Sequence, residues 1–226
     1  PLMAVSFGLF ASSCNDFLDR EPISSITPAQ YFNSADELGA YAINYYTSLI
    51  ATNDAAYNAG PLNVDGDTDN MVVGEANTNY FAPDRWLVPS SGGPSFSVIR
   101  AMNYFLEQVL PKKEAGAISG STEDINHYIG EIYFLRAMAY FNQLRTYGDF
   151  PIITVVPEDK TDQLVELSKR APRNEVARFI LGDLDKAISM LRPGSAFNKV
   201  RIGKEIALLV KSRVALYEAS FERYHK

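Results

Sequence analysis

The chain has 226 residues, of which 46% are hydrophobic and 12% aromatic, a composition typical of a folded globular protein rather than a disordered one. Its 21 basic and 27 acidic residues give a net charge of −6, which argues against nucleic acid as a binding partner. The single cysteine excludes a disulfide framework and the multi-cysteine zinc sites.

The first 13 residues carry no charge and end in the small residues Ala11-Ser12-Ser13, directly before Cys14. Such a run is typical of a secretory signal peptide and is too short to span a bilayer. Small residues before a cysteine also resemble a bacterial lipobox, although position 11 is Ala instead of the usual Leu. We therefore expect residues 1–13 to be a truncated signal peptide remnant and Cys14 to be lipidated. The alternative is an ordinary thiol near the N-terminus.

Residues 14–27 are polar, contain proline and lack a helical period, as expected of a tether between a lipid anchor and a domain. Beyond it, the caps at Thr27 and Ser34 predict a short helical turn and then a helix to about Ala51. Apolar residues at helical spacing predict four further helices, at about 99–109 (closing before Pro111), 122–147, 176–191 and 206–221.

The segment 122–147 is the most apolar of these helices, with one stripe through Tyr133 and Tyr140 and another through Phe134 and Phe141. A helix that is apolar on more than one face is buried between neighbours. Gly148 supplies its end, and Ile152-Ile153-Thr154-Val155-Val156 is expected to be extended. Arg136 lies within this apolar helix, where a paired structural cation is favoured over a functional site.

The predicted fold class is therefore all-α. Five helices with Ala beside Tyr or Phe at their contacts favour a helical repeat scaffold of the tetratricopeptide type, with long irregular loops.

The longest irregular segment, 52–94, contains Asp65-Gly66-Asp67-Thr68-Asp69-Asn70. The aspartates at 65, 67 and 69 match the first, third and fifth positions of a calcium-binding EF-hand loop, but Asn70 replaces the required Gly and the twelfth position is Ala76. An EF-hand is excluded. An Asx-rich surface turn is the favoured interpretation, and a looser calcium site on the three aspartates is the alternative.

The same segment holds the candidate ligand-binding residues. Trp86 is the sole tryptophan, and polar and aromatic side chains precede it: Asn79, Tyr80, Asp84 and Arg85. Flat aromatic rings stack on the C–H face of a sugar, while amide, carboxylate and guanidinium groups bind its hydroxyls. A sugar-binding role for Trp86 stands beside the alternative that it covers the hydrophobic core.

The sequence carries no catalytic motif: GxSxG, HExxH, GxxxxGK[ST] and GxGxxG are all absent. His127 is expected on the exposed start of its helix and not as a metal ligand. Asp183 and Asp185 are two positions apart on a helix, so they point in different directions and form no carboxylate pair. These observations favour a protein that is not an enzyme, and no feature of the sequence supports the alternative of a hydrolase.

Several segments, in order, resemble SusD/RagB-type lipoproteins. They are the lipobox-like Cys14, the residues at 17–38, IRAMNYFLE at 99–107, GEIYFLRAMAYFNQLRTYGDFPII at 130–153, and the segments 173–191 and 203–221. The pattern Phe-Leu-Arg-Ala, Tyr-Phe and Tyr-Gly-Asp-Phe-Pro is the most specific of them.

This resemblance implies an outer-membrane lipoprotein at the cell surface that binds oligosaccharide or polysaccharide and delivers it to a TonB-dependent SusC-like transporter. RagB-type relatives bind peptides, so a peptide- or protein-binding lipoprotein is the alternative. Family members are longer, which implies that residues 28–226 are an incomplete N-terminal helical domain.

Overall fold

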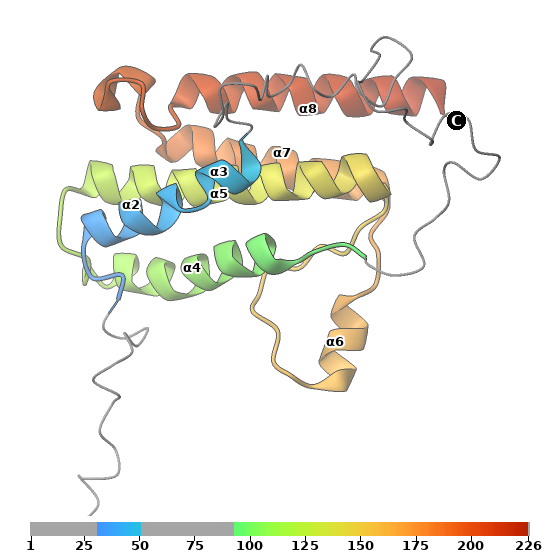
Figure 1. Cartoon of the computed structure of the whole chain (residues 1–226), viewed down its shortest axis with the longest axis horizontal. Coiled ribbons are helices and arrows are strands. Elements are labelled where there is room, and N and C mark those ends of the chain that lie inside the picture. Colours follow the sequence, from blue (N-terminus) through green and yellow to red (C-terminus); the bar gives the residue numbers. More distant parts are fainter. Residues whose placement is uncertain (1–30, 51–92, 226) are drawn as a thin grey trace, which may run out of the picture.

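The structure, a computed structural model, describes residues 31–50 and 93–225. Within these ranges it is helical and contains no sheet, only two isolated β-bridges. Successive long helices run antiparallel in layers (Figure 1): α4 (Ser97–Glu114), α5 (Thr122–Tyr147), α7 (Arg173–Met190) and α8 (Lys204–Tyr224). The predicted all-α scaffold is confirmed.

The central helix is α5, which packs on α4 on one side, on α7 on the other, and on the N-terminal helix α2 (Ala35–Ile43). Of its 26 residues, 15 are buried, as its two apolar stripes predicted. It begins where the Ser121 hydroxyl accepts a hydrogen bond from the Asp124 amide (3.0 Å). It ends at Gly148, whose φ of 72° disfavours any side chain.

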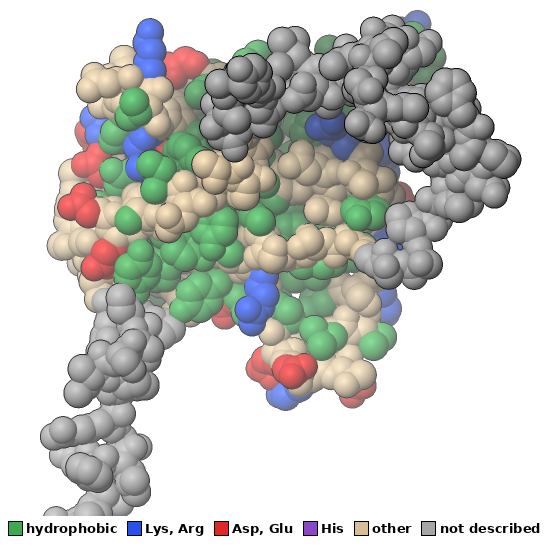
Figure 2. Space-filling view, viewed as in Figure 1, with side chains coloured by type: hydrophobic (Ala, Val, Ile, Leu, Met, Phe, Trp, Pro, Cys, Tyr) green, Lys and Arg blue, Asp and Glu red, His purple; other side chains and the backbone are tan. Residues whose placement is uncertain are grey.

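Helix α2 packs against α4 through aromatic side chains, among them Tyr41 and Phe105. Figure 2 shows hydrophobic side chains gathered on this face of the molecule. The ring of Phe32 contacts those of Tyr41 and Phe105 edge-on, at centroid distances of 5.2 and 5.1 Å. The Tyr41 hydroxyl donates a hydrogen bond to the Ala101 carbonyl (3.0 Å), so the partly buried ring leaves no polar atom unpaired. The predicted cap is present, because the Ser34 hydroxyl accepts from the Glu37 amide.

Two predicted helix limits were wrong. The helix predicted from the Ser34 cap to about Ala51 is interrupted: α2 ends at Ile43, and a separate turn, α3 (Tyr46–Leu49), follows. The break turns the Tyr46 side chain towards α5, where it forms a hydrogen bond. Helix α4 continues through Pro111 to Glu114, because a proline near the C-terminal end costs only one backbone hydrogen bond and its φ is already helical.

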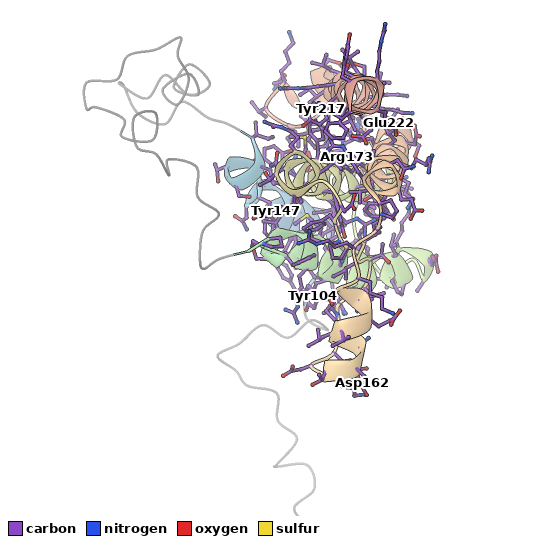
Figure 3. All side chains as sticks on the ribbon, turned by 90° about the vertical axis from the view of Figure 1, so that its right-hand side faces the viewer. Tyr104, Tyr147, Asp162, Arg173, Tyr217 and Glu222 are labelled. Atoms are coloured by element: carbon purple, nitrogen blue, oxygen red, sulfur yellow. The ribbon has the colours of Figure 1, made fainter. Side chains whose placement is uncertain are left out.

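Two elements were not predicted. Helix α6 (Thr161–Leu167) projects away from the bundle, with Asp162 near its far end (Figure 3), and the 3-10 turn η3 (Gly194–Phe197) follows α7. The residues expected to be extended, 152–156, belong to no strand; Phe150 and Ala171 form a single antiparallel bridge beside them. This bridge joins the end of α5 to the start of α7.

The prediction for His127 was also wrong, because this side chain is completely buried. The turn after α7 covers it: the Phe197 ring stacks on the imidazole at 4.3 Å, and the Arg192 amide donates to Nδ1. Its Nε2 lies 3.1 Å from Oε1 of Glu131, one helical turn later on α5. His127 is therefore part of the core.

Glu131 is the centre of a buried polar network. Its carboxylate accepts hydrogen bonds from the Tyr46 hydroxyl (2.6 Å) and from Nε and Nη2 of Arg201 (2.9 and 2.5 Å). Arg201 also donates to the Gly39 carbonyl, so the network joins α5 to α2, α3 and the segment before α8. Burial would raise the pKa of Glu131, but the hydrogen bonds from His127, Arg201 and Tyr46 outweigh it and hold the pKa below its ordinary value.

We predict that Glu131→Gln lowers the free energy of unfolding by about 3 kcal/mol at neutral pH, because it leaves the largely buried Arg201 without its carboxylate. A carboxylate with a lowered folded-state pKa stabilises fully above its unfolded pKa, about 4.3, and loses this effect as the pH falls through the folded pKa. The difference in the free energy of urea unfolding between the native protein and the Glu131→Gln variant should therefore become smaller below about pH 4.

The control is Glu123→Gln, on the exposed first turn of α5, which should change stability by less than about 0.5 kcal/mol. If Glu131→Gln lowers the free energy of unfolding by the same amount at neutral and at acidic pH, the stabilising role assigned to the negative charge of Glu131 is contradicted.

Candidate functional site

The side chains predicted to contact ligand lie outside the described residues. This holds for Trp86, Tyr80, Asn79, Asp84 and Arg85, for the three aspartates at 65, 67 and 69, and for the lipidation candidate Cys14. The described chain resumes at Gly93, seven residues after Trp86 and still within the irregular segment 52–94.

A cavity of about 430 Å³ lies where the chain resumes, between the start of α4, the segment 151–157 and helix α6. This volume is within the usual range for small-ligand pockets. The lining is mainly apolar, with Ser168 and Arg170 as its polar members: Pro94, Phe96, Pro151, Ile153, Pro157, Leu164, Leu167, Ser168 and Arg170. Pro94, the last residue of the irregular segment 52–94, is thus part of the cavity lining.

The wall formed by 151–157 is held by side chains from two helices. Nδ2 of Asn103, on α4, donates to the carbonyls of Ile153 (2.8 Å) and Val155 (3.3 Å). The Tyr140 hydroxyl, on α5, donates to the Ile153 carbonyl (2.9 Å) and accepts from the Ile153 amide (2.8 Å). These bonds replace the ladder that a strand would have, so an irregular segment has a fixed path.

Arg136 supports this wall indirectly, through its hydrogen bond to Asn103. Its Nη1 donates to Oδ1 of Asn103 (2.9 Å), while Nε and Nη2 donate to the two carboxylate oxygens of Asp183 on α7 (2.6 and 2.8 Å). Both charged side chains are buried. The interpretation of Arg136 as a paired structural cation is confirmed, and the chain of bonds runs from α7 through α5 and α4 to the cavity.

The same geometry confirms that Asp183 and Asp185 point in different directions. Asp183 is buried against Arg136, whereas Asp185 is exposed and pairs with Lys211 of α8.

Burial raises the pKa of Tyr140 to about 12, so its hydroxyl keeps its proton at physiological pH and serves as a fixed donor.

The cavity offers shape and apolar contact rather than reactive groups. The ring of Phe96 stacks on that of Phe150 at 4.8 Å with an interplanar angle of 22°, which limits its freedom to move. Arg170 is the cationic member of the lining, and no acidic side chain of the described chain pairs with it. Such a site can hold an apolar or ring-shaped group and a polar or anionic group beside it.

In residues 31–50 and 93–225 no three His, Cys, Asp or Glu side chains gather in a way that could hold a metal ion. Over the same residues, no helix combines the length and the apolar character needed to cross a membrane.

Comparison with known proteins assigns the family. Residues 16–216 match the sequence model of a SusD-like family, described as starch-binding and associating with the outer membrane. The chain belongs to the SusD-like family. Among the curated relatives of this SusD-like protein are SusD-like proteins P2 and P38 of Formosa agariphila, each 23% identical over 93% and 98% of the chain. The matches cover 41% and 42% of those relatives, so the chain spans about two fifths of their length.

Solved structures show the same fold. A SusD-like protein of Bacteroides fragilis superposes with a TM-score of 0.63 at 25% identity, covering 90% of this chain and 39% of the other. A SusD-like carbohydrate-binding protein of the same species superposes with a TM-score of 0.59 at 17% identity, covering 84% and 39%. The family resemblance inferred from the sequence motifs is therefore confirmed.

Sequence reasoning missed the cavity of this SusD-like protein. Its lining comes from three separate segments, and helix α6, which supplies Leu164 and Leu167, was not predicted at all. The available signal was a set of prolines beside apolar residues, at 94, 151 and 157, which marks irregular chain but not where its parts meet.

We predict that Arg136→Met lowers the free energy of unfolding by about 3–5 kcal/mol, because the buried carboxylate of Asp183 then keeps only the more distant and half-exposed ammonium of Lys186 (3.6 Å) as a charged partner. The double variant Arg136→Met/Asp183→Leu should recover at least about half of this loss, since it removes both charges. Chemical denaturation of the three proteins provides the measurement. A double variant as unstable as the single one would show that the cost lies in packing and not in the unpaired charge.

Proposed function

We propose that this SusD-like protein is a cell-surface lipoprotein that captures oligosaccharides and delivers them to a TonB-dependent SusC-like transporter. The observation that carries the proposal is the family match over residues 16–216, to a family described as starch-binding and associating with the outer membrane. The relative from Bacteroides fragilis described as carbohydrate-binding agrees in fold. Because the chain spans about two fifths of its relatives, the activity belongs to the whole protein.

The mechanism is binding without chemistry. Trp86 and Tyr80 would stack on sugar rings, and Asn79, Asp84 and Arg85 would bind hydroxyl groups, in the loop that ends where the cavity wall begins. Pro94 and Phe96, which line the cavity, follow these residues in the chain, and the ring of Phe96 stacks on that of Phe150. The protein makes and breaks no bond, so binding and release govern delivery.

The anchor in this proposal is a lipid on Cys14, which would hold the protein at the outer membrane. Three acyl chains bury enough methylene groups for stable attachment, at about 0.8 kcal/mol for each. Palmitate labelling of the native protein, with Cys14→Ser as the control, tests the anchor: incorporation that depends on Cys14 supports it, and none in the native protein contradicts it.

Calcium is a secondary part of the proposal. Asp65, Asp67 and Asp69 supply the carboxylate oxygens that calcium prefers. Isothermal titration of the protein with calcium, against a variant carrying Asn at the three positions, decides whether the site exists or the aspartates only form a surface turn.

We predict that Trp86→Ala weakens oligosaccharide binding by at least about 1 kcal/mol, or some fivefold in dissociation constant, without loss of fold, because the stacking surface is removed. Affinity electrophoresis across a panel of polysaccharides identifies the ligand, and titration of the whole protein then measures the loss. Tyr147→Ala, which removes an exposed aromatic ring outside the loop, is the matched control and should bind as the wild type does. Equal affinity of the Trp86→Ala variant would remove Trp86 from the site.

A second candidate function is capture of peptides, as in RagB-type proteins, and the composition of the cavity favours it. Its lining is mostly aliphatic and proline-rich, which suits an apolar side chain better than a hydroxylated sugar, and Arg170 could pair with a carboxylate. Titration with hydrophobic peptides separates the two functions: binding that Leu164→Asp abolishes, together with no binding to any polysaccharide, favours the peptide.

A further inference from the structure

A β-bridge beside the cavity is the start of a ladder that the described chain does not continue. The amide of Phe150 donates to the carbonyl of Ala171 (3.2 Å), and the amide of Ala171 donates in return (3.1 Å). The next hydrogen-bonded pairs of such an antiparallel ladder would join residues 152 and 154 to residues 169 and 167. These pairs are not formed, because the chain that leads to Ala171 comes from helix α6 and not from a strand.

The segment that would carry the ladder is held along its inner edge. The amide of Ile153 donates to the Tyr140 hydroxyl (2.8 Å), and its carbonyl accepts from that hydroxyl (2.9 Å) and from Asn103 (2.8 Å). Both polar groups of Ile153 thus point towards the bundle. In an extended chain, successive residues direct these groups to opposite edges, so those of Ile152 and Thr154 point outward.

We define the open edge as the backbone amides and carbonyls of Ile152 and Thr154. Within residues 31–50 and 93–225, no hydrogen bond reaches any of these four groups. Ile152 is partly exposed and Thr154 is exposed, so the groups are accessible from outside. Unpaired amides and carbonyls that repeat every second residue form a template on which another strand can pair.

The cavity of about 430 Å³ lies along this edge. Its lining includes Pro151 and Ile153 on one side, and Leu167, Ser168 and Arg170 on the other side of the interrupted ladder. The side chains of a strand added here would alternate between two faces, so that every second one enters the apolar cavity. Arg170 supplies a cation that no acidic side chain of the described chain neutralises.

We propose that an extended peptide binds to the open edge by strand addition, antiparallel to residues 151–157. One aliphatic side chain of the peptide occupies the cavity, and an Asp or Glu side chain of the peptide pairs with Arg170. The inference rests on the second candidate function, the capture of peptides, and adds to it the way in which the peptide is held. Backbone hydrogen bonds supply the affinity of such a complex, and the cavity supplies its selectivity.

The surroundings of the open edge favour a short peptide over the other possible occupants. Pro151 and Pro157 have no amide hydrogen, so the edge extends over only a few residues. The cavity is enclosed between residues 151–157 and helix α6, which leaves room for a single chain and not for a second folded copy. A peptide repeats its amides and carbonyls at the spacing of the edge, about 6.8 Å for every two residues, whereas a glycan has no such repeat.

A positional-scanning library of N-acetylated hexapeptide amides tests the proposal by fluorescence polarisation with the whole protein. We expect the pools that bind best to carry Leu, Ile or Val at one position and Asp or Glu at another. The best hexapeptide is then made in six forms, each with one N-methylated amide. Methylation of alternate amides should weaken binding about tenfold, the loss of about one hydrogen bond, and methylation of the intervening amides less than about twofold.

A matched pair of variants tests the protein side of the same contact. Thr154→Pro removes an amide hydrogen from the open edge and breaks no hydrogen bond of the described chain, and it should weaken the best hexapeptide about tenfold. Thr154→Val changes the side chain but keeps the amide, and should bind as the wild type does. Arg170→Gln should abolish the preference for Asp or Glu over Asn or Gln.

The outcomes separate this inference from the function on which it rests. Peptide binding that is insensitive to the position of the N-methyl group, and that Thr154→Pro leaves unchanged, would overturn strand addition while peptide capture stands. If no pool binds, peptide capture fails and strand addition fails with it. If Thr154→Pro does not fold, the N-methylated series decides alone.

Discussion

A guanidinium group buried in an apolar helix has to find every partner inside the protein, and Arg136 meets this requirement by connecting three layers. Two of its nitrogens bind Asp183 on α7, and a third binds Asn103 on α4. Helix α5 can therefore neither rotate nor slide without breaking several bonds together. The apolar contacts of α5 supply most of the attraction between layers, while this network selects one register for them.

A second polar network acts further along α5, around Glu131. It involves different neighbours: Tyr46 from α3, the Gly39 carbonyl of α2 through Arg201, and His127 beneath the turn after α7. The two networks are five residues apart on α5 and point to different sides of the helix. One supports the segment that lines the cavity, and the other attaches the N-terminal helix, so each side of the bundle has its own polar attachment.

The fold was largely predictable because local sequence features define α5. Ser121 and Gly148 mark its two ends, and two apolar stripes mark the faces that are buried. The need for a partner at Arg136 was also predictable, but its identity was not, since Asp183 lies 47 positions away in the chain. His127 was misplaced for the same reason: the ring of Phe197, which covers it, follows α7. The side chains assigned to ligand binding, Trp86 among them, stay a prediction. The cavity depends on contacts between distant segments, which no local sequence pattern indicates.

The wall of that cavity has a further consequence for the thermodynamics of capture. Pro94, Pro151 and Pro157 each have a fixed φ, and the bonds from Asn103 and Tyr140 hold Ile153 between two of them. A surface built this way has little backbone entropy left to lose when a ligand arrives. Weak individual contacts can then yield useful affinity, and the ligand can leave again without any refolding of its site, as the proposed delivery of oligosaccharide requires.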